Sequence, residues 1–288
     1  MDQWIKAGKI GAEVLTYAKS IAKPGMPLLE LAEKIEAKMA QLGAKPAFPV
    51  TLSLNHLAAH CTPIPKDQTI FTAEDTLKID IGCHLDGHVS DTALTIGPNK
   101  ELIKAPEEAL KAAIKLATPG TQLREIGKAI QETISSYGFS PILNLSGHQI
   151  KQYDLHAGMT IPNYDNGDTT VLQEGQIIAI EPFATTGKGK VTEGKPSTIY
   201  RLIESKPVRD ANTKKILQHI EKEFSTLPFS KRDLIKKFPT AGFSLNILER
   251  EGILKHYAQL IEETKGIVSQ AEHTVLVKDK PVVLTKRD

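Results

Sequence analysis

Two aspartates, Asp80 and Asp91, interrupt neighbouring runs of apolar and β-branched residues that have the pattern of β-strands. The dipeptide Asp86-Gly87 lies between the two runs and is a strong signal for a tight β-hairpin. A two-residue turn places position 80 opposite position 93, which shares a strand face with Asp91. The sequence therefore predicts that the two carboxylates are diagonal neighbours.

Two carboxylates held this close repel each other, and one of them takes up a proton unless a cation lies between them. A divalent metal ion is the simplest explanation for the pair. The prediction depends on Leu85 pairing with His88, because a turn longer by one residue would place the two aspartates on opposite faces of the hairpin.

Further candidate ligands lie in the second half of the chain. Glu181 closes the apolar run 177–180, and Glu272 precedes the run 274–277. Four carboxylates with one or two imidazoles form a hard, mostly oxygen ligand set that suits two divalent ions such as Mn, Fe or Co. Two such ions, roughly 3.5–4 Å apart, activate water and polarise a carbonyl group. We therefore expect hydrolysis of an amide bond.

The composition excludes several other classes. The chain has 288 residues, 40% of them hydrophobic, and 36 basic against 34 acidic residues, so its net charge of +2 gives no reason to expect nucleic acid as a partner. No signal peptide and no membrane-spanning run is visible, and only Cys61 and Cys83 are present. These features favour a cytoplasmic protein in a reducing compartment. Cys61 follows His60, but neighbours in a strand point to opposite faces, so a catalytic dyad is not expected.

The chain repeats itself at an offset of 95 residues. Pro24-Gly25 corresponds to Pro119-Gly120, and each pair lies between helical patterns, at about 3–22 and 27–42 in the first case and 105–117 and 121–137 in the second. The offset persists to glycines 43 and 138, at expected helix ends. We expect two related halves, about 1–98 and 99–288, with a site between them.

An insertion interrupts the second half. Helical patterns at 209–224, 230–238 and 244–251 follow a strand-like segment near residue 200, with Ser230 and Ser244 as expected N-caps, and strand character returns at Gly266. Residues 204–265 hold 12 basic and 9 acidic residues, an excess too small for a DNA-reading module. A packing role, or a role as a wall of the substrate site, is expected instead.

The motifs resemble those of methionine aminopeptidases, in order and along the whole chain. The segments that carry the resemblance are Asn55-His-Leu-Ala-Ala-His60, Lys78-Ile-Asp-Ile-Gly82, Val89-Ser-Asp-Thr-Ala93, Gly147-His148, His156-Ala-Gly158, Ala179-Ile-Glu-Pro-Phe183 and Glu272-His-Thr-Val275. The inserted helices resemble those of the type II enzymes, and the absence of a long charged N-terminal extension resembles their archaeal form.

The resemblance implies an α/β, duplicated pita-bread fold formed by 1–200 and 265–288, with 201–264 as an inserted helical subdomain. It also implies two divalent ions, which could be Co, Mn, Fe or Zn. Asp80 would bind one ion, His148 and Glu181 the other, and Asp91 and Glu272 would bridge them.

The remaining roles also follow from the resemblance. His156 would bind the scissile carbonyl group, His60 would contact the amide nitrogen, and Glu181 would transfer protons. Three further residues are implied for the methionine pocket: Phe48, Leu155 and Ile199. The substrate would be the initiator methionine of nascent chains, with the ribosome as a candidate place of encounter and no membrane or nucleic-acid partner. A cytoplasmic monomer is expected.

Two alternatives remain at this point. One is a proline-directed peptidase with the same fold, although such relatives usually carry a separate N-terminal domain. The other is a metal-free binding protein that retains the scaffold and docks at a ribosome through the inserted helices. Loss of metal ligands is typical of that class, and every ligand position is filled here. The histidines at 84, 88, 219, 256 and 273 are assigned no role.

Overall fold

The computed structural model describes residues 1–287, which form seven helices and fifteen strands. The helices are α1 Asp2–Ile21, α2 Leu28–Gln41, α3 Lys100–Lys115, α4 Leu123–Ser136, α5 Ala211–Glu223, α6 Lys231–Lys237 and α7 Ala241–Arg250. The strands are β1 Lys45–Leu54, β2 Leu57–Ala59, β3 Leu77–Leu85, β4 His88–Ile96, β5 Ser140–Pro141, β6 Ser146–Ile150, β7 Thr160–Pro162, β8 Ile177–Ile180, β9 Phe183–Thr185, β10 Val191–Leu202, β11 Phe229–Ser230, β12 Leu254–Glu262, β13 Val268–Gln270, β14 His273–Leu276 and β15 Val282–Val283.

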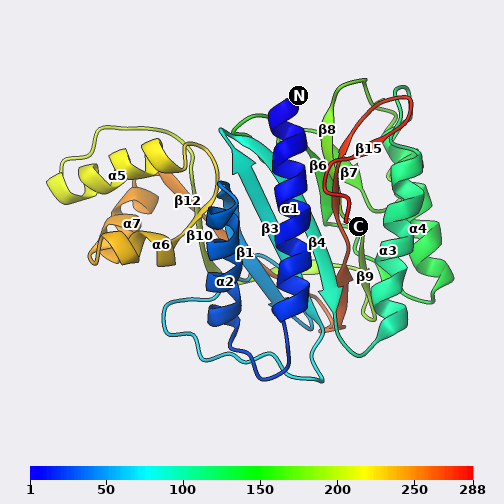
Figure 1. The fold of residues 1–288 in the computed structure, drawn as a ribbon, viewed down its shortest axis with the longest axis horizontal. Helices are drawn as coiled ribbons and strands as arrows, with labels where there is room; N and C mark the ends of the chain where they lie inside the picture. The colour runs from blue at the N-terminus through cyan, green and yellow to red at the C-terminus, as the bar shows by residue number, and fades with distance from the viewer. Residues whose placement is uncertain (288) are drawn as a thin grey trace.

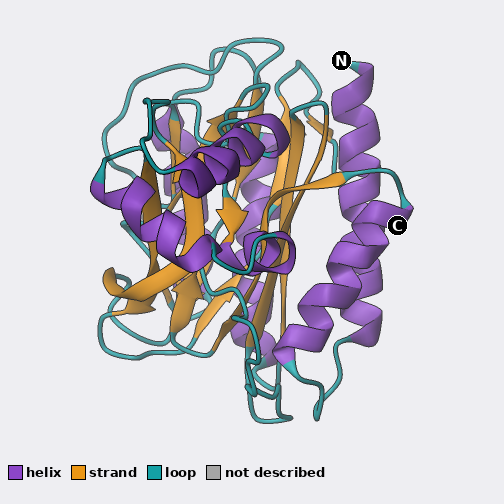
Figure 2. Cartoon of the chain, turned by 90° about the vertical axis from the view of Figure 1, so that its left-hand side faces the viewer, coloured by secondary structure: helices purple, strands orange, loops and turns teal. Residues whose placement is uncertain are grey.

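The four long helices α1–α4 lie along one side of the strands, and α5–α7 project at the left-hand end of the molecule in Figure 1, next to α2 (Figures 1 and 2). The sheets have the orders β1-β3-β4, β11-β10-β12-β2, β13-β9-β5 and β15-β14-β8-β6-β7. One apolar core lies beneath α1 and α2, and a second lies beneath α3 and α4. Within residues 1–287, no helix is both long and apolar enough to cross a membrane.

The predicted repeat is confirmed at the level of individual hydrogen bonds. Each helical pair turns through a glycine with positive φ, 94° at Gly25 and 87° at Gly120. The Gly25 N–H donates to the carbonyl oxygen of Phe71 at 2.7 Å, and the Gly120 N–H donates to that of Leu172 at 2.8 Å. Both helical hairpins are therefore held to the following loop of their own half in the same way. Helix α3 begins five residues earlier than predicted, because Asn99 caps it.

The predicted hairpin register is also confirmed. Leu85 pairs with His88 across the turn, and Asp80 therefore lies opposite Ala93. The two turn residues have positive φ angles, 47° at position 86 and 78° at position 87, which is the conformation of the type I′ turn favoured in hairpins. Asp80 and Asp91 consequently lie on the same face of the β3–β4 ladder.

The hairpin turn also holds a loop from the second half. The N–H of Tyr153 donates to the carbonyl oxygen of Gly87 at 2.9 Å, and the side-chain amide of Gln152 donates to that of Asp86 at 2.8 Å. The Tyr153 ring packs directly on the turn, and a Cβ atom at position 87 would lie only 2.3 Å from it. Glycine is therefore required at position 87 for both backbone conformation and space.

A seam of hydrogen bonds joins β4 of the first half to the segment that leads into β14 of the second. The hydroxyl of Thr274 donates to the carbonyl oxygen of Asp91 and accepts its N–H, both at 2.7 Å. The hydroxyl of Thr92 donates to the carbonyl oxygen of Glu272 at 2.9 Å, and the Glu272 N–H donates to the carbonyl of Ala93 at 3.2 Å. The two halves are therefore joined at their acidic residues.

In the sequence, the inserted helices lie between β10 and β12, two long strands that pair with each other in antiparallel fashion. Strand β12 also pairs with β2 of the first half. Strand β12 was not predicted, and its residues fall inside the expected insertion 201–264. Ser230 caps α6 as predicted, accepting the N–H of Asp233. The prediction of Ser244 as an N-cap is wrong, because α7 starts at Ala241 and Thr240 occupies the N-cap position.

One face of the β10–β12 ladder packs on the inserted helices, where Tyr200 and Leu254 join their apolar core. Ion pairs hold the insertion to α2: the guanidinium of Arg232 contacts the carboxylate of Glu36, and the ammonium of Lys236 lies 3.0 Å from that of Glu33. The other face of the ladder is left for the site described below.

Glu262 anchors the end of β12. Its side chain is fully buried, and its carboxylate accepts the N–H groups of Lys188 at 2.7 Å and of Thr264 and Gly266 at 2.8 Å, together with the Thr264 hydroxyl. Burial alone would raise the pKa of this carboxyl group, but the hydrogen bonds outweigh it and the pKa is lowered. The charged form therefore stabilises the fold.

We expect Glu262→Gln to lower the free energy of unfolding by about 2 kcal/mol near pH 7, because an amide accepts fewer of these hydrogen bonds. A lowered folded-state pKa means that the contribution is present above the pKa of the unfolded chain and is lost on acidification. The difference from wild type should therefore be constant from about pH 8 to pH 5 and shrink below about pH 4. Urea titrations across this range measure it. The exposed neighbour, changed as Glu263→Gln, is the control, and equal effects would contradict the anchor.

We expect Gly87→Ala to be more destabilising than Gly167→Ala. Both glycines have φ of +78°, but only position 87 faces a ring, while nothing lies within 4 Å of a Cβ at position 167. The excess loss for Gly87→Ala should be about 1–3 kcal/mol, the usual range for overpacking. Denaturant titration of each variant gives the difference. The pair Gly87→Ala with Tyr153→Ala should lose less than the sum of its single changes, and simple additivity would refute the contact.

Candidate active site

Four acidic side chains from both halves meet in one cavity of about 290 Å³. Asp80 comes from β3 and Asp91 from β4, while Glu181 follows β8 and Glu272 precedes β14. Asp91 and Glu272 are almost completely buried, with 4% and 1% of their surface exposed, and Asp80 and Glu181 keep partial exposure toward the cavity. The strand ladders and the seam thus bring together residues up to 192 positions apart.

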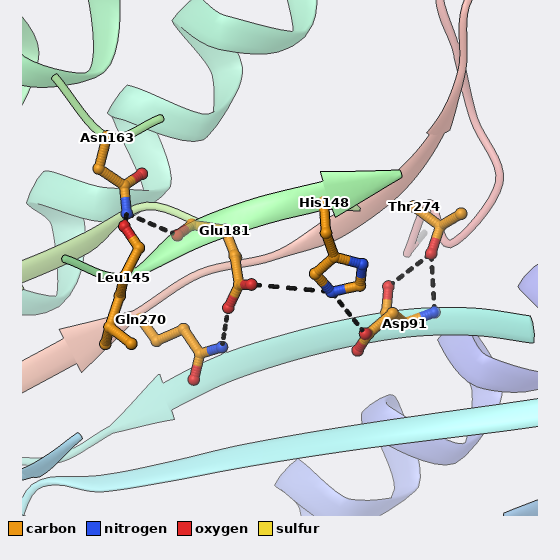
Figure 3. Close-up of polar contacts among 7 residues, drawn as sticks. All are labelled: Asp91, Leu145, His148, Asn163, Glu181, Gln270 and Thr274. Carbon is orange, nitrogen blue, oxygen red and sulfur yellow. Dashed lines mark hydrogen bonds and ion pairs between the residues drawn. The ribbon is translucent and has the colours of Figure 1, made fainter. Parts of the chain in front are cut away.

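His148, from β6, lies between the acids (Figure 3). Its Nε2 atom is 3.5 Å from Oδ2 of Asp91 and 3.8 Å from Oε1 of Glu181. Ligand atoms of Asp91, His148 and Glu272 all lie within 4.8 Å of one another, which is close enough for one ion to contact all three. On the far side of Glu181, the side-chain amide of Gln270 donates to its Oε2 at 3.4 Å and orients the carboxylate.

The charged forms of the four acids are electrostatically unfavourable without a counter-ion. Burial raises the pKa of Asp91 to about 7. Burial and the charge of Asp91 raise the pKa of Asp80 well above its ordinary value, and the same two causes raise the pKa values of Glu181 and Glu272. Within the cavity these groups have no cationic side chain that could neutralise four charges. A bound cation of high charge is the partner that this arrangement lacks.

The donor atoms fit divalent metal ions. Three of the acids have a buried carboxylate oxygen without a hydrogen-bond partner, Oδ1 of Asp80, Oδ1 of Asp91 and Oε2 of Glu272. Burial lowers the pKa of His148 to about 4, so its imidazole is neutral near pH 7 and keeps a lone pair for a metal. Oxygen-rich sets with a neutral imidazole bind ions such as Mn, Fe, Co and Zn.

Two further histidines border the acids. His60 has a left-handed backbone with φ of 61°, which is uncommon in a residue other than glycine. Its Nδ1 lies 3.1 Å from the carbonyl oxygen of Ala258, and since a carbonyl only accepts, Nδ1 carries the hydrogen and Nε2 is an acceptor. The ring of His156 packs against that of His148, with 4.5 Å between their centroids.

His156 is neutral near pH 7, although its ring is accessible from the cavity. Desolvation by the surrounding walls lowers its pKa, and the protonated forms of His148 and His60 and the positive charge of Arg201 act in the same direction. A neutral imidazole in this place can donate one N–H hydrogen bond into the cavity. The burial of His60 likewise lowers its pKa.

The apolar part of the cavity is formed by Phe48, Leu155 and Ile199, which are between 3% and 8% exposed. The Phe48 ring lies against Gly82, where a Cβ atom would be 2.3 Å from it. Leu155 directly precedes His156, so the loop held by the hairpin turn carries one apolar and one polar wall residue.

All ten positions named from the sequence line this single cavity: Phe48, His60, Asp80, Asp91, His148, Leu155, His156, Glu181, Ile199 and Glu272. None of the five histidines left without a role lines it in the part of the chain that the structure describes.

Several wall residues were not anticipated. Tyr257 and Leu260 come from β12, the strand that was missed, and Thr51 faces the site because it pairs with Asp80 across β1 and β3. Gln270, which orients Glu181, was also overlooked. A signal existed for it, because Gln270 stands two positions before Glu272 in an extended segment and so faces the same side.

Comparison with known proteins accounts for this geometry. The model of metallopeptidase family M24 matches residues 2–279. The methionine aminopeptidase of Pyrococcus horikoshii is 48% identical over 291 residues, covering 99% of each chain. Two solved structures share the fold at low identity. A thermophilic Arx1 has a TM-score of 0.86 and 17% identity, covering 98% of this chain and 89% of that one. A methionine aminopeptidase from Thermotoga maritima has a TM-score of 0.72 and 22% identity, covering 99% and 96%.

The predicted duplicated pita-bread fold is thereby confirmed, as is the resemblance from which it was inferred. The match spans both halves and the inserted helices, and includes every segment that carries the candidate ligands. The chain belongs to the methionine aminopeptidases of metallopeptidase family M24.

Proposed function

We propose that this protein removes the N-terminal methionine from polypeptide chains by hydrolysis that depends on two divalent metal ions. The observation that carries the proposal is the convergence of four carboxylates and one neutral imidazole, with unpartnered oxygen atoms facing one cavity. Membership of the family supports the same reaction.

In the proposed arrangement Asp80 would hold one ion, His148 and Glu181 would hold the other, and Asp91 and Glu272 would be shared by the two. The close approach of Asp91, His148 and Glu272 supports a shared position for the bridging acids. The donor set accepts Co, Mn, Fe or Zn, and availability in the cell decides between them. When bound, such ions lower the pKa of a water molecule and polarise the scissile carbonyl group.

The side chains around the ligands supply the proton transfers and the orientation. We assign the carboxylate of Glu181, which Gln270 orients, to accept a proton from the attacking water and deliver it to the departing amine. We assign the N–H of His156 to the oxygen of the scissile carbonyl group, where negative charge develops. His60 keeps its Nε2 lone pair for the substrate N–H, because its Nδ1 hydrogen is bound by Ala258.

The cavity walls explain why a terminal methionine would be chosen. Phe48, Leu155 and Ile199 offer an apolar pocket for a flexible thioether side chain. A free α-amino group would bind beside the acids and the metal ions, a contact that a blocked or internal amide nitrogen cannot make. The site therefore favours cleavage after the first residue only.

We further propose that the substrates are nascent chains, met in the cytoplasm with the ribosome as a candidate place of encounter, and that the protein acts as a monomer. Neither nucleic acid nor membrane is needed as a partner. In this proposal 1–200 and 265–288 form the catalytic domain, and 201–264 form the inserted subdomain. Pro228 and Ile199 place the insertion and its supporting strand at the cavity wall, which supports a role in substrate binding.

Asp91→Asn and Glu272→Gln should each lower the rate of methionine release from Met-Gly-Met or Met-Ala-Ser peptides by about a hundredfold or more. Each change replaces a negatively charged ligand by a neutral amide of the same shape, so fewer ions are retained. Elemental analysis should find about two ions for wild type and a lower number for each variant. The exposed acid altered in Glu174→Gln serves as the control. Unchanged turnover and metal content in either variant would refute the ligand assignment. Faster cleavage of Xaa-Pro than of Met-Gly peptides by wild type would favour a proline-directed enzyme.

His156→Ala should reduce kcat for a Met-Ala peptide by about a hundred- to a thousandfold, the usual effect of removing one donor to a developing oxyanion. KM and the number of bound ions should change little, because the imidazole is not assigned to a metal. Steady-state kinetics and elemental analysis separate the two effects. His219→Ala, at a half-buried position of the insertion that does not line the cavity, is the matched control. A loss of metal with a smaller change in kcat would show that His156 is a ligand instead.

A further inference from the structure

A second cleft, of about 360 Å³, adjoins the active cavity and shares four of its wall residues. His60 and His156 stand at this boundary together with Tyr257 and Leu260. In the proposed function, on which this inference rests, the two histidines contact the bond to be cleaved. A polypeptide whose first residue fills the cavity must leave it past this bond. The adjoining cleft is placed to receive the residues that follow.

The charges of this cleft are unusual. Arg201 of β10 and Lys255 of β12 are direct partners across the antiparallel ladder, so two cations face the same side of the sheet next to each other. Like charges in opposite positions destabilise a pair of strands. Among residues 1–287 no ion pair involves either side chain. The unfavourable pair thus has no counter-ion within the described chain.

Arg201 and Lys255 lie on the face of the β10–β12 ladder that is turned toward the active cavity. Strand residues alternate between faces, and Tyr200 and Leu254 point into the core of the inserted helices. Arg201 and Lys255 therefore point away from those helices, on the side of Ile199 and Tyr257, which line the active cavity. In Figure 1 the two strands separate the inserted helices from the rest of the molecule.

One acid, Glu193, also lines the cleft, and it is exposed. Its single charge leaves an excess of positive charge beside Arg201 and Lys255. A guanidinium next to an ammonium is well suited to a carboxylate, which it binds through two parallel hydrogen bonds.

We propose that this cleft, which we call the basic cleft, binds a carboxylate carried by the second or third residue after the cleaved bond. Two sources offer that group: the side chain of aspartate or glutamate, and the free C-terminus of a short peptide. Both would be drawn to the same cation pair. Exposed ion pairs contribute little, so the selectivity is moderate, about three- to tenfold in kcat/KM.

The test compares kcat/KM for four peptides, and for the amidated form of the last of them, with the metal-loaded enzyme. Met-Ala-Ala-Ala-amide is the neutral reference, Met-Ala-Glu-Ala-amide and Met-Ala-Lys-Ala-amide vary the side-chain charge, and Met-Ala-Ala with a free C-terminus supplies the other carboxylate. We expect the Glu peptide to exceed the Lys peptide about three- to tenfold, and the difference to shrink between 50 mM and 500 mM salt. The free-acid tripeptide should exceed its amidated form.

The double change Arg201→Gln with Lys255→Gln should abolish these differences while leaving the neutral peptide within about twofold of wild type. Lys195→Gln removes one positive charge from β10 outside the basic cleft and should keep the preference. Equal kcat/KM for the Glu and Lys peptides with wild type, or a preference that survives in the double variant, would overturn the proposal.

The neutral peptide separates this inference from the proposed function. If wild type cleaves it without charge preference, the basic cleft is refuted and the aminopeptidase activity stands. If wild type cleaves none of the peptides, the proposed function fails. The peptides then remain intact as ligands, and calorimetry of the Glu and Lys forms with wild type and the double variant tests the cleft directly.

Discussion

The structure depends on holding four carboxylates against their mutual repulsion and away from bulk water. Asp91 and Glu272 are almost fully buried, and their raised pKa values show that the charged forms are unfavourable without a cation. Flexible supports would let such groups move apart. Asp80 and Asp91 instead come from adjacent strands in uninterrupted register, and Glu272 is tied by its backbone to Ala93. The rigidity of the ladders is therefore a requirement of the metal site rather than an incidental property of the fold.

The same requirement explains why the site lies at the junction of two related halves. Each half builds its own core beneath its own pair of helices. The reciprocal hydrogen bonds of Thr274 with the backbone of Asp91 join the halves at the level of the ligands. Because the hairpin turn at Gly87 also supports the loop before His156, the first half positions groups of the second as well. Neither half contains all of the proposed ligands.

Much of this arrangement could be predicted from local signals. The Asp86-Gly87 dipeptide determines the loop length, and the loop length determines whether Asp80 and Asp91 share a face of the hairpin. Two of the proposed ligands could therefore be placed from one short segment. The Pro-Gly repeats likewise marked both helical hairpins. Strand β12 could not be recognised in this way. Its sequence mixes Lys255, His256 and Tyr257 with apolar residues, and its strand conformation results from pairing with the distant strands β10 and β2.

The missed strand matters because it gives the insertion two functions on opposite faces. One face of the β10–β12 ladder completes the core of the helices α5–α7, and the other faces the active cavity. Glu262 anchors the end of β12, and the ion pair of Arg232 with Glu36 holds the inserted helix α6 to α2. The β10–β12 ladder is therefore the structural element that the helical insertion and the cavity have in common. Ile199 and Tyr257 of this ladder line the active cavity and Arg201 lines the basic cleft, so the inserted lobe supports walls of the proposed substrate site without supplying any of the proposed metal ligands.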